Sequence, residues 1–290
     1  MNRYHWLRLL APVMGRFPAA SYPIAAAAGW LTWHLQPRMR RTLLRNVLPF
    51  CDGDRARARS EGRRALRNIG RYWVDVASIP HRDMANFERD HIRLVNGERL
   101  DVLKDPGPVL VVSAHTGNPE LCLQAITFRG RQFTALVENI QPPAMGRYLL
   151  NLRSSAGGRF EAASIGGVRA VLEALRAGEV AGIVADRDIQ GTGVCVQLAG
   201  RPVKIARGPW ELARRTGATV LPVFATRDWR DGFTVRVEEP FKVDCIAPLE
   251  EAVRDAAEHF AGLLEAHLRR EPGQWTVSED FWSVHRCAKG

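Results

Sequence analysis

The sequence from Pro108 to Ala125 reads PVLVVSAHTGNPELCLQA and predicts a strand, a tight turn and a helix. Its first part, Val109 to Ser113, is apolar or small, as in a buried strand. Asn118 is a good N-cap for the helix. Pro119 suits the first helical position because it has no N–H group to leave unpaired.

Two side chains with acid–base chemistry flank this turn. His115 would lie at the carboxyl end of the strand and Glu120 in the first helical turn. Ligands bind at that edge of open α/β sheets, and histidine is the natural base near neutral pH. We therefore interpret His115 as a general base and Glu120 as its orienting acid. The alternative, equally supported by these residues alone, is a histidine that closes the turn beside an ordinary first-turn acid.

The rest of the chain from about residue 90 alternates between strand and helix patterns. Strands are expected at 92–95, 108–113, 133–138, 158–162, 180–185, 193–198, 219–226 and 233–238. Helices are expected at 97–104, 119–128, 142–156, 166–177, 206–216 and 248–269. This alternation predicts a three-layer α/β domain with a central, mainly parallel sheet flanked by helices.

The positive charge of the chain is concentrated at its beginning. The net charge of +10 arises within residues 1–73, which carry fourteen arginines against Asp52, Asp54 and Glu61 and sum to +11. The remaining residues sum to −1. Such a local excess is typical of proteins that bind anionic membranes or nucleic acid. No nucleic-acid-binding motif accompanies the charge, so we expect no nucleic-acid partner.

The first 37 residues resemble a membrane-associating segment. Residues 17–37 carry no formal charge and include Trp30 and Trp33, with arginines following. The run is Ala-rich and is interrupted by Pro18 and Pro23, so we favour a segment lying in the membrane interface over one that spans the bilayer. A helical hairpin packed on the domain is the alternative. A secretory signal is not expected, because no compact apolar core precedes a clear cleavage site.

These patterns divide the chain into three parts. We expect an apolar membrane-associating segment at 1–37, a basic helical region packed on the core at 38–85, and an α/β core at 86–290. Five scattered cysteines without a Cys-x-x-Cys pair support neither a disulfide framework nor a zinc site, and a reducing compartment fits best.

Further candidates lie at other predicted strand and helix ends. Asp186 and Asp188 flank Arg187 at the end of the strand expected at 180–185. A structural Asp–Arg pair is the alternative there, and two aspartates alone are weak evidence for a metal. Arg207 opens a helix, where a cation is unfavourable to the helix dipole, so we expect it to meet an anion. No Gly-x-Ser-x-Gly elbow exists, which indicates direct attack by a hydroxyl rather than a covalent intermediate.

The order of these motifs resembles the bacterial lipid A biosynthesis acyltransferases and their actinobacterial relatives, the phosphatidylinositol mannoside acyltransferases. The resemblance covers roughly residues 38–282 and leans toward the second branch through His-Thr-Gly-Asn and Ala-Asp-Arg-Asp. The motifs in order are His115-x4-Glu120, then Glu138 with Arg153, Asp186-Arg187-Asp188, Arg207-Gly208, and Gly217-Ala218-x-Val-x-Pro222. The relatives that use glycerol phosphate carry a Phe-Pro-Glu-Gly-type loop, which this sequence lacks.

The resemblance implies transfer of a fatty acyl group from acyl-CoA or acyl carrier protein to a hydroxyl of a membrane glycolipid. It implies catalytic roles for His115, Glu120 and Asp186, with Asp188 as the alternative strand-end acid. It also implies a peripheral or monotopic enzyme on the cytoplasmic face of the bacterial inner membrane, held by the Arg-rich region, with neither metal nor cofactor. The alternatives are a non-catalytic lipid-binding protein and an acyl thioesterase. The expected substrate contacts are Thr116, Gly117, Asn118, Glu138, Arg153, Asp188 and Arg207. Thr116 and Gly117 are expected to act as oxyanion donors, and Arg153 as a contact for phosphate on the acceptor or donor.

Overall fold

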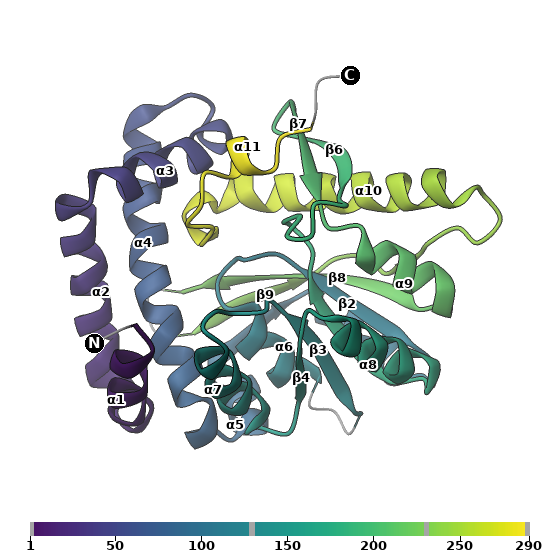
Figure 1. Cartoon of the computed structure of the whole chain (residues 1–290), viewed down its shortest axis with the longest axis horizontal. Helices are drawn as coiled ribbons and strands as arrows, with labels where there is room; N and C mark the ends of the chain where they lie inside the picture. Colours follow the sequence, from purple (N-terminus) through teal and green to yellow (C-terminus); the bar gives the residue numbers. More distant parts are fainter. Residues whose placement is uncertain (1–2, 128–130, 229–231, 288–290) are drawn as a thin grey trace.

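The computed structural model describes residues 3–127, 131–228 and 232–287, and within them it contains a central sheet of eight strands (Figure 1). The order is β1-β9-β8-β2-β5-β3-β4, and β10 pairs with β8. All neighbours are parallel except the pairs of β8 with β9 and with β10. The strands are β1 (Ile92–Val95), β2 (Val109–Ser113), β3 (Phe133–Val137), β4 (Arg159–Ala162), β5 (Val180–Val184), β8 (Thr219–Arg227), β9 (Phe233–Val237) and β10 (Phe241–Lys242). This confirms the predicted central, mainly parallel sheet.

Helices cover both faces of this sheet, and β2 runs through its centre. Leu110 and Val112 point into a core shared with α8, α9 and α10. Val109 and Val111 point into the opposite core, shared with α5 and α6. This alternation follows from the two-residue period of a strand, and it explains why β2 is apolar throughout. These helices are α5 (Met84–His91), α6 (Pro119–Thr127), α8 (Ile165–Arg176), α9 (Gly208–Thr216) and α10 (Leu249–Arg270), while α7 (Pro143–Ser154) lies beside β4.

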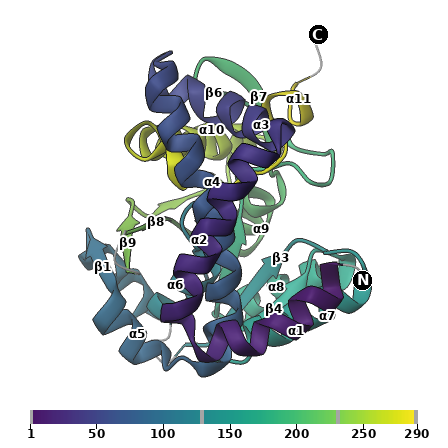
Figure 2. The ribbon, with the colours of Figure 1, turned by 90° about the vertical axis from the view of Figure 1, so that its left-hand side faces the viewer.

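The first four helices pack against one another at one end of the sheet (Figure 2). Prolines begin α2 and α3, and Asp54 caps α4 by accepting the N–H groups of Ala56 and Arg57. The long helices α2 and α4 approach closely at Gly29 and Gly70. A Cβ atom on Gly70 would lie 2.6 Å from the carbonyl oxygen of Ala25. The helices are α1 (Arg3–Arg16), α2 (Pro18–Leu35), α3 (Pro37–Val47) and α4 (Arg55–Ser78).

The uncharged N-terminal residues form a helix that packs on the rest of the protein. Residues 18–35 form α2, which packs along α4 rather than standing alone. Among the described residues, no helix combines the length and the apolar character that crossing a bilayer requires.

Several elements differ from the sequence-based prediction. The strand expected at 193–198 is β6 (Val194–Leu198), which leaves the central sheet and forms an antiparallel hairpin with β7 (Arg201–Ile205). The segment before β1 contains the helix α5, capped by Asp83. Short 3-10 helices are η1 (Leu48–Cys51), η2 (Ile79–His81), η3 (Gly97–Leu103) and η4 (Pro272–Gln274), and α11 (Phe281–Val284) follows the last of them.

The expectation that no disulfide forms was wrong. Cys195 in β6 is bonded to Cys287 near the C-terminal end, across a sequence separation of 92 residues. The hairpin and the last described residues lie side by side, since Val203 of β7 forms a β-bridge with Arg286. A spacing this long carries no signature in the sequence, and only the fold brings the two thiols together.

Candidate active site

The site begins with the register of two central strands. β2 and β5 are parallel neighbours, and Ser113 lies opposite Val184. His115 and Asp186 each stand two residues beyond that pair, at the same carboxyl edge of the sheet. The strand pairing therefore brings a histidine and an aspartate together, although they are 71 positions apart in the chain.

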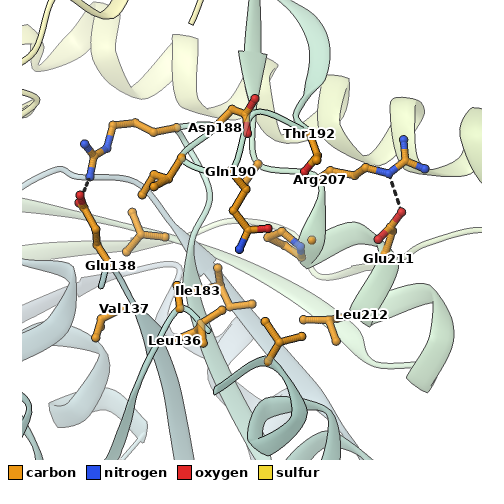
Figure 3. A pocket seen from close by; sticks show the side chains of 18 of the residues that line it. Leu136, Val137, Glu138, Ile183, Asp188, Gln190, Thr192, Arg207, Glu211 and Leu212 are labelled. Carbon is orange, nitrogen blue, oxygen red and sulfur yellow. Dashed lines mark hydrogen bonds and ion pairs between the residues drawn. The ribbon is translucent and has the colours of Figure 1, made fainter. Parts of the chain in front are cut away.

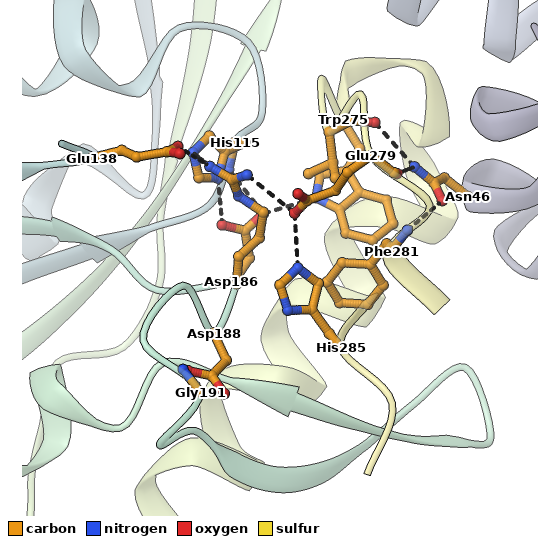
Figure 4. Close-up of polar contacts among 12 residues, drawn as sticks. Asn46, His115, Glu138, Asp186, Asp188, Gly191, Trp275, Glu279, Phe281 and His285 are labelled. Atoms are coloured by element: carbon orange, nitrogen blue, oxygen red, sulfur yellow. Dashed lines mark hydrogen bonds and ion pairs between the residues drawn. The ribbon is translucent and has the colours of Figure 1, made fainter. Parts of the chain in front are cut away.

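Asp186 holds His115 through two contacts (Figure 4). Its Oδ1 lies 2.7 Å from the imidazole Nδ1, and its Oδ2 accepts the backbone N–H of His115 at 3.2 Å. Oδ2 also accepts the indole N–H of Trp275 at 2.8 Å. Burial alone would raise the pKa of Asp186, but His115, Arg187 and Trp275 together lower it to about 2. An ionised carboxylate can only accept hydrogen bonds, so the ring carries its proton on Nδ1 and presents a lone pair at Nε2.

Glu120 does not have the position that the sequence suggested. Its Oε2 accepts Nε of Arg153 at 2.6 Å and the hydroxyl of Tyr72 at 3.0 Å. Arg153 also donates to the Tyr72 hydroxyl at 2.8 Å, which closes a triangle against α4. In the first turn of α6, the Glu120 side chain points toward α4, whereas the imidazole meets β5. Asp186 and not Glu120 is therefore the acid on the imidazole.

Arg153 belongs to this triangle and not to an open phosphate site. Only 3% of its surface is exposed. Burial would lower the pKa of Arg153, but Glu120 and Tyr72 raise it above its ordinary value, while burial raises the pKa of Tyr72. The expected phosphate contact is thus a buried cation that ties α7 to α4 and α6.

The turn residues Thr116, Gly117 and Asn118 are buried, and their polar groups are largely committed within the protein. The N–H of Thr116 donates to the carbonyl of Ala114, and that of Gly117 donates to the carbonyl of Gln274. These amides are therefore occupied, contrary to the expected role as oxyanion donors. Gly117 has a φ of +58°, and a Cβ there would lie 2.7 Å from the carbonyl oxygen of Ala225, so the turn requires glycine.

Asn118 links the turn to a buried network centred on Asp75 of α4. Its Oδ1 caps α6 by accepting the N–H of Leu121, and its Nδ2 donates to Asp75 at 3.0 Å. Asp75 also accepts the Tyr22 hydroxyl at 2.6 Å and forms an ion pair with Arg227. Asn118 is thus a structural residue that joins the His115 turn to the N-terminal helices.

Arg187 lies on the other side of the imidazole. Its Nη2 is 3.0 Å from Nε2 of His115 and 2.8 Å from Oε2 of Glu138, and its Nη1 is 3.1 Å from Oε1 of Glu279. Glu279 in turn accepts Nε2 of His285 at 2.8 Å. That hydrogen bond and the nearby Arg187 lower the pKa of Glu279 to about 2, although its burial acts in the opposite direction.

The C-terminal segment carries Trp275, Glu279 and His285 to the site. Asn46 of α3 holds it by donating to the carbonyls of Val277 and Glu279, at 3.0 and 2.8 Å, and by accepting the N–H of Phe281. Thr276 donates to the carbonyl of His115 through both its N–H and its hydroxyl. The C-terminal segment from Trp275 to His285 therefore completes the site, whose other residues follow the central strands β2 and β5.

A cavity of about 680 Å³ opens beside this cluster (Figure 3). Leu136, Ile183 and Leu212 form an apolar part of its wall. Glu138 and Arg187 also line it, and Arg187 contacts His115. Side chains from β3, β5 and α9 thus surround a space of the size that holds a small molecule or a lipid chain.

Asp188 and Arg207 both line this cavity without reaching the imidazole. Asp188 accepts the N–H of Gly191 at 2.9 Å and closes its own loop. Arg207 is bound by Glu211 and Glu250. The expected anion on Arg207 is thus replaced by two carboxylates of the protein. In the described part of the chain, no group of three or more His, Cys, Asp or Glu side chains is arranged to hold a metal ion.

Sequence reasoning missed several residues of the cluster. Asp75 stands in the apolar run Trp73-Val74-Asp75-Val76, and a lone acid in such a run signals a buried polar contact. Trp275, Glu279 and His285 carry no comparable signal, because their positions depend on how the C-terminal segment folds back.

Comparisons with known proteins show the family to which the chain is similar. The profile of the bacterial lipid A biosynthesis acyltransferase family matches residues 6–282. A phosphatidylinositol mannoside acyltransferase of Mycobacterium tuberculosis is 30% identical over 229 residues, which cover 75% of this chain and 69% of that protein. The protein of the same name from Mycolicibacterium smegmatis is 28% identical over 235 residues, covering 76% and 71%.

A solved structure of the 1-acyl-sn-glycerophosphate acyltransferase of Thermotoga maritima covers 91% of this chain and 98% of that one. The sequence identity is 16% and the TM-score is 0.38, a likeness too low to carry an argument. The family profile matches nearly the whole chain, and this match alone establishes the family. The chain belongs to the bacterial lipid A biosynthesis acyltransferase family.

Proposed function

We propose that this protein transfers a fatty acyl group from an acyl thioester to a hydroxyl of a membrane glycolipid, with His115 as the general base. The observation that carries the proposal is the pairing of Asp186 with Nδ1 of His115 beside an apolar cavity. Membership of an acyltransferase family supports the reaction type. The names of the mycobacterial relatives support a glycolipid acceptor of the phosphatidylinositol mannoside type.

The proposed reaction uses the lone pair at Nε2 of His115. Nε2 takes the proton of the acceptor hydroxyl while the hydroxyl oxygen attacks the thioester carbonyl carbon. Asp186 keeps the proton on Nδ1 and stabilises the imidazolium that forms. When the tetrahedral intermediate collapses, the carbonyl re-forms, the carbon–sulfur bond breaks, and the imidazolium returns its proton to the thiolate. No covalent intermediate with the protein is required.

The cavity suits the acyl chain of the donor. Its apolar lining includes Val168, Ile183, Ile189 and Leu249, and its end at Arg187 and Glu138 adjoins the imidazole. A chain lying in it would bring its carbonyl to His115.

The N-terminal helices suit a membrane surface. Among the described residues, nine of the fourteen exposed large apolar side chains lie in residues 6–35. Trp6 is 50% exposed, Phe17 61% and Trp30 56%. Tryptophan and arginine together favour the headgroup zone of a bilayer. We propose that α1 and α2 rest on the cytoplasmic leaflet, the side on which acyl thioesters are made, and that the protein is peripheral.

A group of arginines next to these helices supports an anionic leaflet. Two surface cavities are lined by Trp30 and Trp33 together with Arg40, Arg41, Arg59, Arg63 and Arg67. Within the described ranges, none of these five guanidinium groups forms an ion pair with an acid of the protein. Burial and the neighbouring arginines lower the pKa of Arg67. Unpaired like charges of this kind are stabilised by external anions such as lipid phosphates.

Vesicle flotation tests the membrane part of the proposal. The protein should float with phosphatidylinositol-containing vesicles more than with phosphatidylcholine vesicles. Combined Arg59→Gln, Arg63→Gln and Arg67→Gln should weaken flotation, since each basic residue contributes about 1 kcal/mol near an anionic leaflet. Arg169→Gln with Arg176→Gln, two exposed positions on α8, is the matched control. Equal flotation of both variants would contradict the proposal.

The enzymatic part is tested with labelled acyl-CoA, purified protein and phosphatidylinositol mannoside in vesicles. The wild type should form labelled glycolipid, and His115→Ala should form none while its circular dichroism is unchanged. Release of free fatty acid irrespective of glycolipid would indicate a thioesterase instead. Binding of acyl-CoA without any turnover would indicate a lipid-binding protein.

A further inference from the structure

Arg187 caps the nitrogen that the proposed reaction needs. Its Nη2 lies 3.0 Å from Nε2 of His115. A guanidinium group can only donate hydrogen bonds, so it donates to the lone pair at Nε2. The acceptor hydroxyl must occupy that same position before its proton can move. Arg187 therefore has to leave Nε2 in every catalytic cycle.

The guanidinium group is held in place by contacts that do not involve the imidazole. Glu138 binds Nη2 at 2.8 Å and Glu279 binds Nη1 at 3.1 Å. Of the five N–H donors of Arg187, three are committed, and the Nε donor is buried without a partner among the described residues. Loss of the contact with His115 would free one N–H on Nη2 while both carboxylates still hold the group beside the base.

Arg187 also stands where the thioester carbonyl would arrive. It lines the cavity proposed for the acyl chain and contacts His115 at the same time. Attack at that carbonyl makes an oxyanion, which needs donors about 3 Å away. The backbone amides of Thr116 and Gly117 are already bonded to Ala114 and Gln274. Arg187 is thus a cation directly beside the reacting atoms with donors to spare.

We propose that Arg187 is a catalytic residue that moves from Nε2 of His115 to the thioester oxygen. This inference rests on the proposed function. When the acceptor hydroxyl binds Nε2, Arg187 remains on Glu138 and Glu279 and turns its freed N–H to the carbonyl oxygen. As the hydroxyl oxygen bonds to carbon and its proton passes to Nε2, the carbonyl electron pair moves to the oxygen beside Arg187. Expulsion of the thiolate, which takes the proton from Nε2, restores the carbonyl and leaves the lone pair at Nε2 to which Arg187 returns.

The test compares Arg187→Met, Arg187→Lys and the wild type in the acyl-CoA and glycolipid assay. Arg187→Met should lower kcat about 10²- to 10³-fold, the effect of removing one oxyanion donor, with a much smaller change in KM for acyl-CoA. Added guanidinium chloride should restore part of kcat to Arg187→Met, and an equal concentration of sodium chloride should not. Arg187→Lys should fall between, because lysine keeps the charge without the fork that two carboxylates hold.

The controls separate this proposal from its alternatives. Arg169→Met, which removes an exposed arginine of α8, should retain wild-type kcat. Arg187→Met with a kcat equal to or above that of the wild type would show that Arg187 only blocks the base, and would overturn the proposal. A change confined to KM would overturn it as well. If the wild type transfers no acyl group, the proposed function fails. If the wild type is active and Arg187→Met is equally active, the proposed function stands and the inference about Arg187 fails.

Discussion

Asp186 binds His115 twice, once through the ring nitrogen Nδ1 at 2.7 Å and once through the backbone N–H at 3.2 Å. One carboxylate therefore fixes both the main chain of the residue and the orientation of its ring. Because Asp186 is fully buried and its other contact is the indole of Trp275, little in the surroundings permits the ring to turn away.

Asp186→Asn should lower kcat by about 10²- to 10⁴-fold, because an amide at this position favours the wrong tautomer of His115. Asp188→Asn should cost less than tenfold, since Asp188 contacts the N–H of Gly191 and not the imidazole. Both values come from initial rates of labelled glycolipid formation on protein whose folding is checked by circular dichroism. A larger loss for Asp188 than for Asp186 would contradict the assignment of the acid.

Glu120→Gln should act on stability more than on chemistry. It removes the charge opposite Arg153, whose side chain is 4% exposed, and leaving a buried cation unpaired costs about 3–5 kcal/mol. Denaturant unfolding measures this loss. The control is Glu173→Gln, which breaks an exposed pair with Arg169 and should change the free energy of unfolding by less than about 1 kcal/mol. If Glu120→Gln abolished kcat at unchanged stability, Glu120 would belong to the chemistry after all.

His267 should make stability depend on pH. Burial lowers its pKa from 6.5 to about 3 in the folded protein, and it packs against Phe224 at 5.0 Å. Between pH 6.5 and 3 the unfolded chain binds a proton at His267 that the folded protein does not bind. The contribution of His267 to the free energy of unfolding is therefore complete above about pH 6.5 and declines as the pH falls toward 3. The slope is at most about 1.4 kcal/mol per pH unit.

His267→Phe keeps an aromatic ring against Phe224 and should reduce this slope between about pH 6.5 and 4. Free energies of unfolding at several pH values measure it. His259→Phe, at an exposed position of the same helix, should leave the slope unchanged. Parallel pH profiles for His267→Phe and the wild type would refute a buried neutral imidazole.

Cys195→Ser should destabilise the protein by about 2–5 kcal/mol, because the bond to Cys287 closes a loop of 92 residues. Reductant should have the same effect on the wild type and none on the variant. Cys245→Ser changes an exposed free thiol and is the matched control. The bond itself is checked by mass after alkylation without reduction; alkylation of Cys195 in the untreated protein would contradict it.

The regular parts of the fold could be predicted because local patterns determine them. The strand, turn and helix of residues 108–125 follow from apolar periodicity, an Asn cap and a proline, and β2 and α6 form there. The two-stranded sheet of β6 and β7 was predicted less well, because a strand pattern does not say which sheet the strand joins. The alternation of apolar and polar residues indicates which side chains of a strand are buried. It does not indicate which strands pair with it.

The acid of the site shows the same limit. Glu120 is five positions from His115, and its proximity in the sequence suggested a pair. The side chain instead follows the direction of α6 toward Tyr72. Asp186 is far away in the chain but equivalent in strand register. Parallel pairing, more than spacing along the chain, decides which groups meet at a sheet edge. Trp275 and Glu279 reach the site in another way, through a C-terminal segment that Asn46 holds against the domain.

The close approach of α2 to α4 at Gly29 and Gly70 has a geometric consequence for substrate choice. Because neither glycine carries a Cβ atom, the backbones of the two helices lie in direct contact, and α4 carries Asp75, which is bonded to Asn118 in the turn of His115. A leaflet touching α1 and α2 would then lie at a constant height from the imidazole. Under the proposed membrane contact, the distance of an acceptor hydroxyl from the bilayer surface would contribute to which hydroxyl reaches His115.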